Sequence, residues 1–94
     1  PDKLDVFIAV MGDAAKAYGL KLCRELRAKG LSAEMDTLAR NIKNQFKYAN
    51  RLNAKYTVVL GDNEMAEGVA AVKDMAAQEQ HNVKFEDLYE VLSK

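Results

Sequence analysis

The chain has 94 residues, which fits one domain and leaves no room for a second. Lys and Arg together number 14, as do Asp and Glu, so the net charge is zero and a uniformly basic nucleic-acid binder is excluded. The single cysteine, Cys23, excludes an internal disulfide and a four-cysteine zinc site, and it fits a reducing, cytoplasmic setting.

The first part of the chain reads as a strand followed by a helix. Residues Leu4–Met11 form a nearly continuous apolar run, typical of a strand that is covered on both faces. Asp13 is a candidate N-cap for a helix that we expect to stop at Gly30. Gly19 lies inside this helix at a cost of about 1 kcal/mol, which suggests close packing on the sheet.

The same alternation continues through the middle of the chain. Leu31–Met35 is expected to form a short second strand, and a helix follows from Ile42 to about Leu52. Tyr56–Leu60 is a third apolar run that reads as a buried strand, and Gly61 ends it. Strand, helix, strand, helix, strand is the order that right-handed crossovers produce in a parallel sheet.

After the third strand the pattern changes. Gly68–Met75 is expected to be a more exposed strand and Gln80–Val83 another, separated by a turn at Ala76–Glu79. This connection is too short for a crossover helix, so the two strands are expected to be antiparallel neighbours. An amphipathic helix over Phe85–Leu92 closes the chain. The prediction is one α/β domain with a mixed sheet.

The second helix carries a local positive charge in a neutral protein. The segment from residue 40 to residue 51 contains no acidic residue. The spacing of its cations places Lys43 and Lys47 on one face, while Phe46 on the neighbouring face is expected to point into the core. The basic face suits contact with phosphates, but it is equally explained as an ordinary solvated helix face. Its four cations are Arg40, Lys43, Lys47 and Arg51.

Three polar residues have both a structural and a functional interpretation. Asn41 could cap the second helix, or its amide could read the edge of an unstacked base. Glu64 belongs to a turn after the third strand, at the sheet edge where open α/β folds bind ligands, although turn-forming residues alone would explain it. Lys73 on the fourth strand could contact a phosphate or simply be a solvent-facing charge.

Nothing in the sequence indicates catalysis or a cofactor. His81 is the only histidine and Cys23 the only cysteine, so a metal site is not expected. No glycine-rich nucleotide-binding motif is present, and no apolar run approaches the roughly 18 residues of a membrane helix. Because the chain begins with Pro1 rather than Met, we expect an excised piece of a longer protein.

Three segments in order resemble the C-terminal anticodon-binding domain of histidyl-tRNA synthetases. Leu22–Glu34 (LCRELRAKGLSAE) is similar to one family segment, and Lys43–Tyr56 (KNQFKYANRLNAKY) is similar to the helix and strand entry that follow it. Val59–Met75 (VLGDNEMAEGVAAVKDM) is similar to a third. Any one segment would be weak evidence, but together with the first strand and the last helix they cover nearly the whole chain.

The resemblance implies a fold and a function. The fold is a three-layer α/β/α domain with a five-stranded mixed sheet in strand order 2-1-3-4-5, in which strand 4 is antiparallel. The function is to dock on the anticodon stem-loop of tRNA(His) and read unstacked bases. Carried over by position, the base-contacting residues are Asn41, Glu64 and Lys73. The backbone-contacting residues are Arg40, Lys43, Lys47 and Arg51.

The resemblance also implies partners beyond this chain. The parent enzyme would use ATP and Mg in a catalytic domain that is absent here, so no cofactor is expected in this domain and no aminoacylation from it alone. Such synthetases are usually homodimers, although an isolated domain could be a monomer. One departure from the family is the turn Ala76–Gln80, which lacks the usual glycine and could have another shape.

Two other functions compete with this interpretation. The domain could be a regulatory or protein-interaction module that kept the synthetase fold without specific tRNA reading. Topology alone would also allow a small flavodoxin-like enzyme or nucleotide binder, although topology is a poor guide to function.

Overall fold

The structure, a computed structural model, describes residues 3–94, so Pro1 lies outside the described residues. The first five elements are β1 (Leu4–Val10), α1 (Asp13–Ala28), β2 (Ala33–Met35), α2 (Ile42–Arg51) and β3 (Ala54–Leu60). The remaining elements are α3 (Asp62–Glu67), β4 (Val69–Asp74), β5 (Glu79–Lys84), the 3-10 turn η1 (Phe85–Asp87) and α4 (Leu88–Leu92).

The five strands form one mixed sheet in the order β2-β1-β3-β4-β5. β1 is parallel to both of its neighbours, with Val6 opposite Ala33 of β2 and Tyr56 of β3. β4 runs antiparallel to β3 and to β5. The predicted fold class, including the antiparallel fourth strand, is confirmed.

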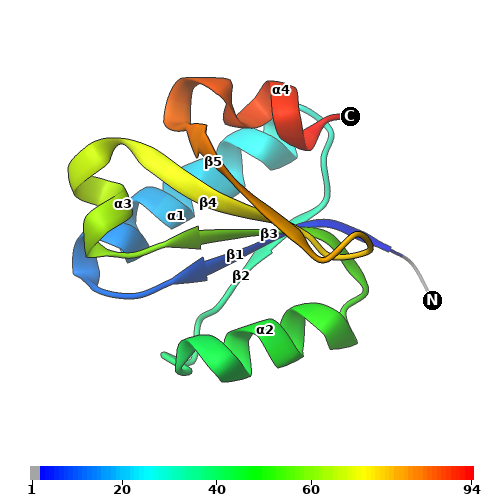
Figure 1. Cartoon of the computed structure of the whole chain (residues 1–94), viewed down its shortest axis with the longest axis horizontal. Helices are drawn as coiled ribbons and strands as arrows, with labels where there is room; N and C mark the ends of the chain where they lie inside the picture. The colour runs from blue at the N-terminus through cyan, green and yellow to red at the C-terminus, as the bar shows by residue number, and fades with distance from the viewer. Residues whose placement is uncertain (1–2) are drawn as a thin grey trace.

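Helices cover both faces of this sheet. α1 and α4 lie on one face and α2 lies on the other (Figure 1). Because successive side chains of a strand point to opposite faces, β1 contributes to both cores. Its Val6 and Ile8 pack in the larger core with α1 and α4, while Phe7 and Ala9 pack under α2 with Ala49. This explains why β1 reads as an uninterrupted apolar run.

The start of α1 differs from the prediction. Gly12, with a φ of +96°, occupies the N-cap position, and Asp13 is the first helical residue with no side-chain capping bond. The close packing predicted at Gly19 is confirmed. A Cβ at Gly19 would lie 2.7 Å from Val10 Cγ1 and 2.9 Å from Met35 Sδ, so only glycine allows α1 to approach the sheet this closely.

β4 is more buried than its sequence suggests. The prediction of a more exposed strand was wrong, because Ala70, Ala71 and Val72 are all buried. β4 is an interior strand with β3 on one side and β5 on the other, and small side chains pack there without giving a strongly apolar pattern.

A short helix, α3, stands where the sequence predicted only a turn. Glu64 Oε1 accepts a hydrogen bond from the Gly61 backbone N–H at 2.8 Å, which satisfies a donor at the helix start. Gly68 ends the helix in the left-handed conformation with a φ of +69°. Both signals are present in the sequence, but Gly61-Asp62-Asn63 also matches a simple turn.

The hairpin between β4 and β5 is built without glycine. Gln78 adopts a φ of +59°, a conformation that glycine adopts far more easily. Asp74 Oδ1 accepts hydrogen bonds from the N–H groups of Ala76 and Ala77, each at 3.1 Å. The Gln78 N–H donates to the Asp74 carbonyl at 2.8 Å. These bonds keep the turn tight despite the strained residue.

No helix within residues 3–94 has the length and apolar character needed to span a bilayer.

Candidate nucleic-acid interface

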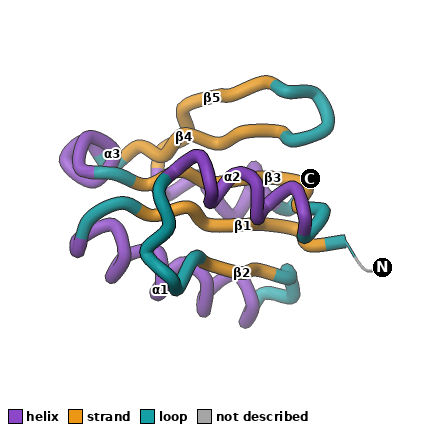
Figure 2. Tube along the Cα trace, turned by 90° about the horizontal axis from the view of Figure 1, so that it is seen from below, coloured by secondary structure: helices purple, strands orange, loops and turns teal. Residues whose placement is uncertain are grey.

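A groove of about 690 Å³ opens beside α2, where β1 and β3 end. It exists because α2 packs on β1 and β3, while the β4–β5 hairpin extends past the helix (Figure 2). The groove is therefore floored by strands and bordered by α2 and α3. It is lined by Met11, Gly12, Phe46, Val59, Gly61, Asp62, Asn63, Glu64, Ala71 and Gln80.

Glu64, which the sequence predicted to contact a base, lines this groove. The side chain is half-buried, and its Oε1 bonds the Gly61 backbone. Its Oε2 accepts no hydrogen bond within the described residues, so that oxygen could accept one from a ligand. The carboxylate thus combines a fixed position with an available acceptor.

Lys73 reaches the same region from β4. It is half-buried, and its Nζ lies 5.1 Å from the centre of the Phe46 ring, within cation–π range. Phe46 was predicted to be a core residue, and it does pack against the core under α2. It is only half-buried, however, and its remaining surface lines the groove. The sequence signal for this partial exposure was the position of Phe46 at the margin of the apolar face of α2.

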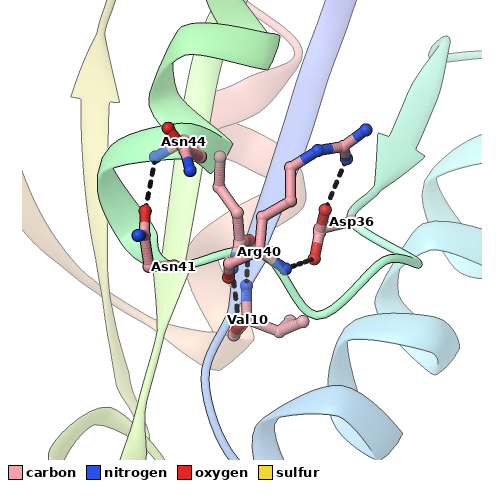
Figure 3. A network of polar contacts seen from close by, with 6 residues as sticks. Val10, Asp36, Arg40, Asn41 and Asn44 are labelled. Carbon is pink, nitrogen blue, oxygen red and sulfur yellow. Dashed lines mark hydrogen bonds and ion pairs between the residues drawn. The ribbon is translucent and has the colours of Figure 1, made fainter.

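Asn41 is the N-cap of α2 and does not line the groove. Its Oδ1 accepts a hydrogen bond from the Asn44 N–H at 2.9 Å (Figure 3). The capping interpretation of Asn41 is therefore confirmed. Its side-chain nitrogen donates no hydrogen bond within residues 3–94, and the residue is exposed, so this donor remains available at the helix start.

Three of the four predicted basic residues form an exposed face on α2. Lys43, Lys47 and Arg51 are spaced by four residues and are all exposed. Within the described part of the chain, none of them forms an ion pair. We call these three residues the basic face. An anion approaching it would meet no competing carboxylate partner.

Arg40 is engaged differently. Its Nη1 lies 2.7 Å from Oδ1 of Asp36, which is almost fully buried (Figure 3). The guanidinium also stacks over the Tyr48 ring at 4.3 Å from the ring centre. Arg40 therefore holds the loop before α2, and a phosphate contact would have to share its guanidinium with these partners.

Two residues that organise this region were missed in the sequence. Asp36 is 2% exposed and Gln45 is 0% exposed, and both make hydrogen bonds to the backbone of Arg40, just before the α2 N-cap. Asp36 follows a three-residue strand and Gln45 is a polar residue in a largely polar helix, so neither residue type indicated burial. The clue available for Gln45 was its place within the KNQFKYA segment that carries the family resemblance.

The described residues contain no group of three His, Cys, Asp or Glu side chains that could hold a metal ion. Cys23 is buried, and burial raises the pKa of its thiol, which keeps it protonated at neutral pH. His81 is exposed, with Nε2 3.7 Å from the Glu79 carboxylate.

Residues 5–94 match the family model for the anticodon binding domain, and the chain therefore belongs to that family. Relatives place it among the histidyl-type members, as the three motif segments predicted. The histidine–tRNA ligase of Lysinibacillus sphaericus is 52% identical over 91 residues, which are 97% of this chain and 22% of the ligase. That of Alkaliphilus oremlandii is 46% identical over 96 residues, covering 99% of this chain and 23% of the ligase.

Solved structures agree with this placement. Apo histidyl-tRNA synthetase from S. aureus superposes with a TM-score of 0.91 at 42% identity, over 96% of this chain and 26% of that one. The RNA binding domain of threonyl-tRNA synthetase from Cryptosporidium parvum has a TM-score of 0.84 at 18% identity, which shows a shared fold alone. This chain spans less than a quarter of the length of the two ligases named above.

Proposed function

We propose that this domain recognises the anticodon stem-loop of tRNA(His). It would do so for a histidine–tRNA ligase whose catalytic domain, using ATP and Mg, lies in a part of the parent protein outside this chain. The observation that carries the proposal is the groove holding Glu64 and Phe46 next to the unpaired basic face of α2. The relatives that are histidine–tRNA ligases support tRNA(His) as the proposed partner.

The groove suits unstacked bases. Single-stranded RNA is read through stacking on aromatic rings and hydrogen bonds to base edges. The half-buried Phe46 ring offers a stacking surface, Glu64 Oε2 offers an acceptor, and the Lys73 ammonium lies close to both the ring and the groove. At the entrance to α2, the free side-chain nitrogen of Asn41 offers a donor to a base carbonyl.

The basic face suits the RNA backbone. Phosphates are contacted mainly by Lys and Arg, and such contacts give affinity without sequence information. Lys43, Lys47 and Arg51 stand along one side of α2, whose first turn Asn41 caps. Backbone contacts on this face would therefore hold the loop beside the groove while the bases turn inward.

A protein-interaction or regulatory role is the second candidate. The proposed parent is a cytoplasmic homodimer in which this domain contacts the catalytic domain, so some of its surface would serve protein contacts. That alternative predicts no dependence of RNA binding on the anticodon.

The test is binding of the 94-residue chain to two RNA hairpins, the tRNA(His) anticodon stem-loop and the same stem with a changed anticodon. Affinities are measured at low and moderate salt, because phosphate contacts weaken steeply with salt. Preference for the histidine anticodon at both salt concentrations supports the proposal. Equal binding to both hairpins, or none, favours the protein-interaction role.

A Glu64→Gln variant tests base reading within the same experiment. Glutamine can still accept the hydrogen bond from Gly61, so the helix start is kept while the carboxylate is lost. We expect the preference between hairpins to fall by about tenfold, the value of one discriminating hydrogen bond. The control is Glu67→Gln at the other end of α3, which does not line the groove and should leave the preference unchanged.

A further inference from the structure

Gln45 is a fully buried polar side chain on the face of α2 that packs against the sheet, with an exposed fraction of 0%. Apart from Thr57, whose hydroxyl contacts Met75 Sδ, the core on this side is formed by apolar side chains such as Phe7, Ala9 and Ala49. Burying a carboxamide costs free energy unless its hydrogen bonds are made, whereas an apolar residue could fill the same space without that desolvation cost. The presence of glutamine points to a role for its hydrogen bonds.

The carboxamide of Gln45 pairs with the backbone of β1 as a neighbouring strand would. Its Oε1 accepts a hydrogen bond from the Val10 N–H at 2.9 Å, and its Nε2 donates to the Val10 carbonyl at 2.9 Å. Two residues earlier on β1, the partner is backbone, because the Asp36 N–H donates to the Ile8 carbonyl at 3.3 Å. Gln45 thus takes the place of the neighbouring strand where the chain after β2 turns away.

The same side chain fixes the residue just before the α2 N-cap. Gln45 Nε2 also donates to the Arg40 carbonyl at 2.7 Å, while the Arg40 N–H donates to Asp36 Oδ2 at 3.0 Å. Both the carbonyl and the N–H of Arg40 are therefore hydrogen-bonded. Figure 3 shows the bond from the Arg40 N–H to Asp36. Ala39 before it has a φ of +51°, a strained conformation that persists only where the surroundings enforce it.

We infer that Gln45 is a positioning residue for anticodon reading, an inference that rests on the proposed function. Apolar packing under α2 is non-directional and would tolerate small shifts along the helix axis. The three hydrogen bonds of Gln45 are directional, and they tie α2 to Val10, the residue before Met11 of the groove. They set where Asn41 stands relative to the bases and where Lys43 stands relative to the phosphates.

The test is the ratio of affinities for the histidine-anticodon hairpin and the changed-anticodon hairpin. Gln45→Met keeps the volume but leaves both Val10 groups without their partner. We expect the ratio to fall about tenfold or more, since small displacements of binding groups are costly. Because unfolding lowers both affinities by the same factor, loss of stability alone leaves the ratio unchanged.

Two further variants keep the test decisive. Leu26→Ala removes a buried side chain on the opposite face of the sheet, so it should destabilise the domain and keep the ratio. Gln45→Asn keeps the carboxamide on a side chain one methylene shorter, so it can keep only part of the three hydrogen bonds of Gln45. It should lower the ratio by less than Gln45→Met, and it replaces that variant if Gln45→Met does not fold.

The outcomes separate the inference from the proposed function. Asn41→Ser, which keeps a capping oxygen, should lower the ratio in the wild-type chain and lower it little further alongside Gln45→Met. A wild-type preference that survives in the Gln45 variants, or that Leu26→Ala reduces equally, overturns the inference alone. A wild-type chain with no preference overturns the proposed function and the inference with it.

Discussion

At the scale of residues, Glu64 and Asn41 each hold the start of a helix and keep hydrogen-bonding capacity to spare. Glu64 uses one carboxylate oxygen on the Gly61 backbone, and Asn41 uses its oxygen on Asn44. The structural and functional interpretations of these residues are therefore compatible. A substitution to alanine would mix both effects, since removing a cap costs about 1 kcal/mol.

Gln78 is the residue whose backbone is least suited to its side chain in the β4–β5 turn. Replacing it with glycine should raise the free energy of unfolding by about 0.5–1 kcal/mol, because a φ of +59° strains a residue with a Cβ. Loss of the hydrogen bond from Gln78 Nε2 to the Met75 carbonyl offsets part of the gain. Urea denaturation measures the difference.

The matched control is Ala77→Gly in the same turn. Ala77 does not have a positive φ, so glycine there relieves no strain and only adds freedom to the unfolded chain. We expect this variant to be slightly less stable than the wild type. If both glycine variants shift stability in the same direction, the strain at Gln78 is not the cause.

At the scale of elements, the different faces of α2 contact the sheet, the groove and the solvent. Gln45 and Ala49 face the sheet, Phe46 borders the groove, and Lys43 and Lys47 face solvent. This division follows from helical periodicity, so the basic face was predictable from spacing. The buried amide was not, because a glutamine in a polar stretch gives no sign that it pairs with a strand.

The basic face should contribute affinity without discrimination. Lys43→Ala and Lys47→Ala are each expected to weaken binding of both hairpins by about three- to tenfold at low salt. Each should also reduce the slope of log affinity against log salt by about 0.7–0.9, the value for one phosphate contact. Titrations at three salt concentrations measure both quantities.

Lys21→Ala is the control for these two variants. Lys21 is an exposed lysine on α1, which covers the other face of the sheet (Figure 1). Its removal changes the net charge by the same amount and should leave affinity and slope nearly unchanged. A loss equal to that of Lys43→Ala would mean that overall charge, and not the basic face, drives binding.

The long strands were easier to predict than the short elements. β1 and β3 are recognisable in the sequence as apolar runs, and the short link between β4 and β5 indicates that these two strands pair antiparallel. α3 was missed because six residues cannot display a helical period, and its start resembles a turn. The burial of β4 was missed because Ala70 and Ala71 owe it to their position between two strands.

At the scale of the whole molecule, zero net charge does not oppose RNA binding, because charge is distributed unevenly. The basic face lies on α2 on one side of the sheet, while the carboxylates of Glu86, Asp87 and Glu90 lie in or next to α4 on the other. The sequence located the basic segment. It did not show the groove, which depends on how far α2 reaches across the sheet.

The central claim is that RNA binds on the α2 side, at the groove and the basic face. Backbone amide NMR shifts recorded while the histidine-anticodon hairpin is added test it most directly. The account predicts the largest shifts at Gly61, Glu64, Lys73 and the first turn of α2. Shifts concentrated on α1 and α4, with the groove unaffected, would contradict it.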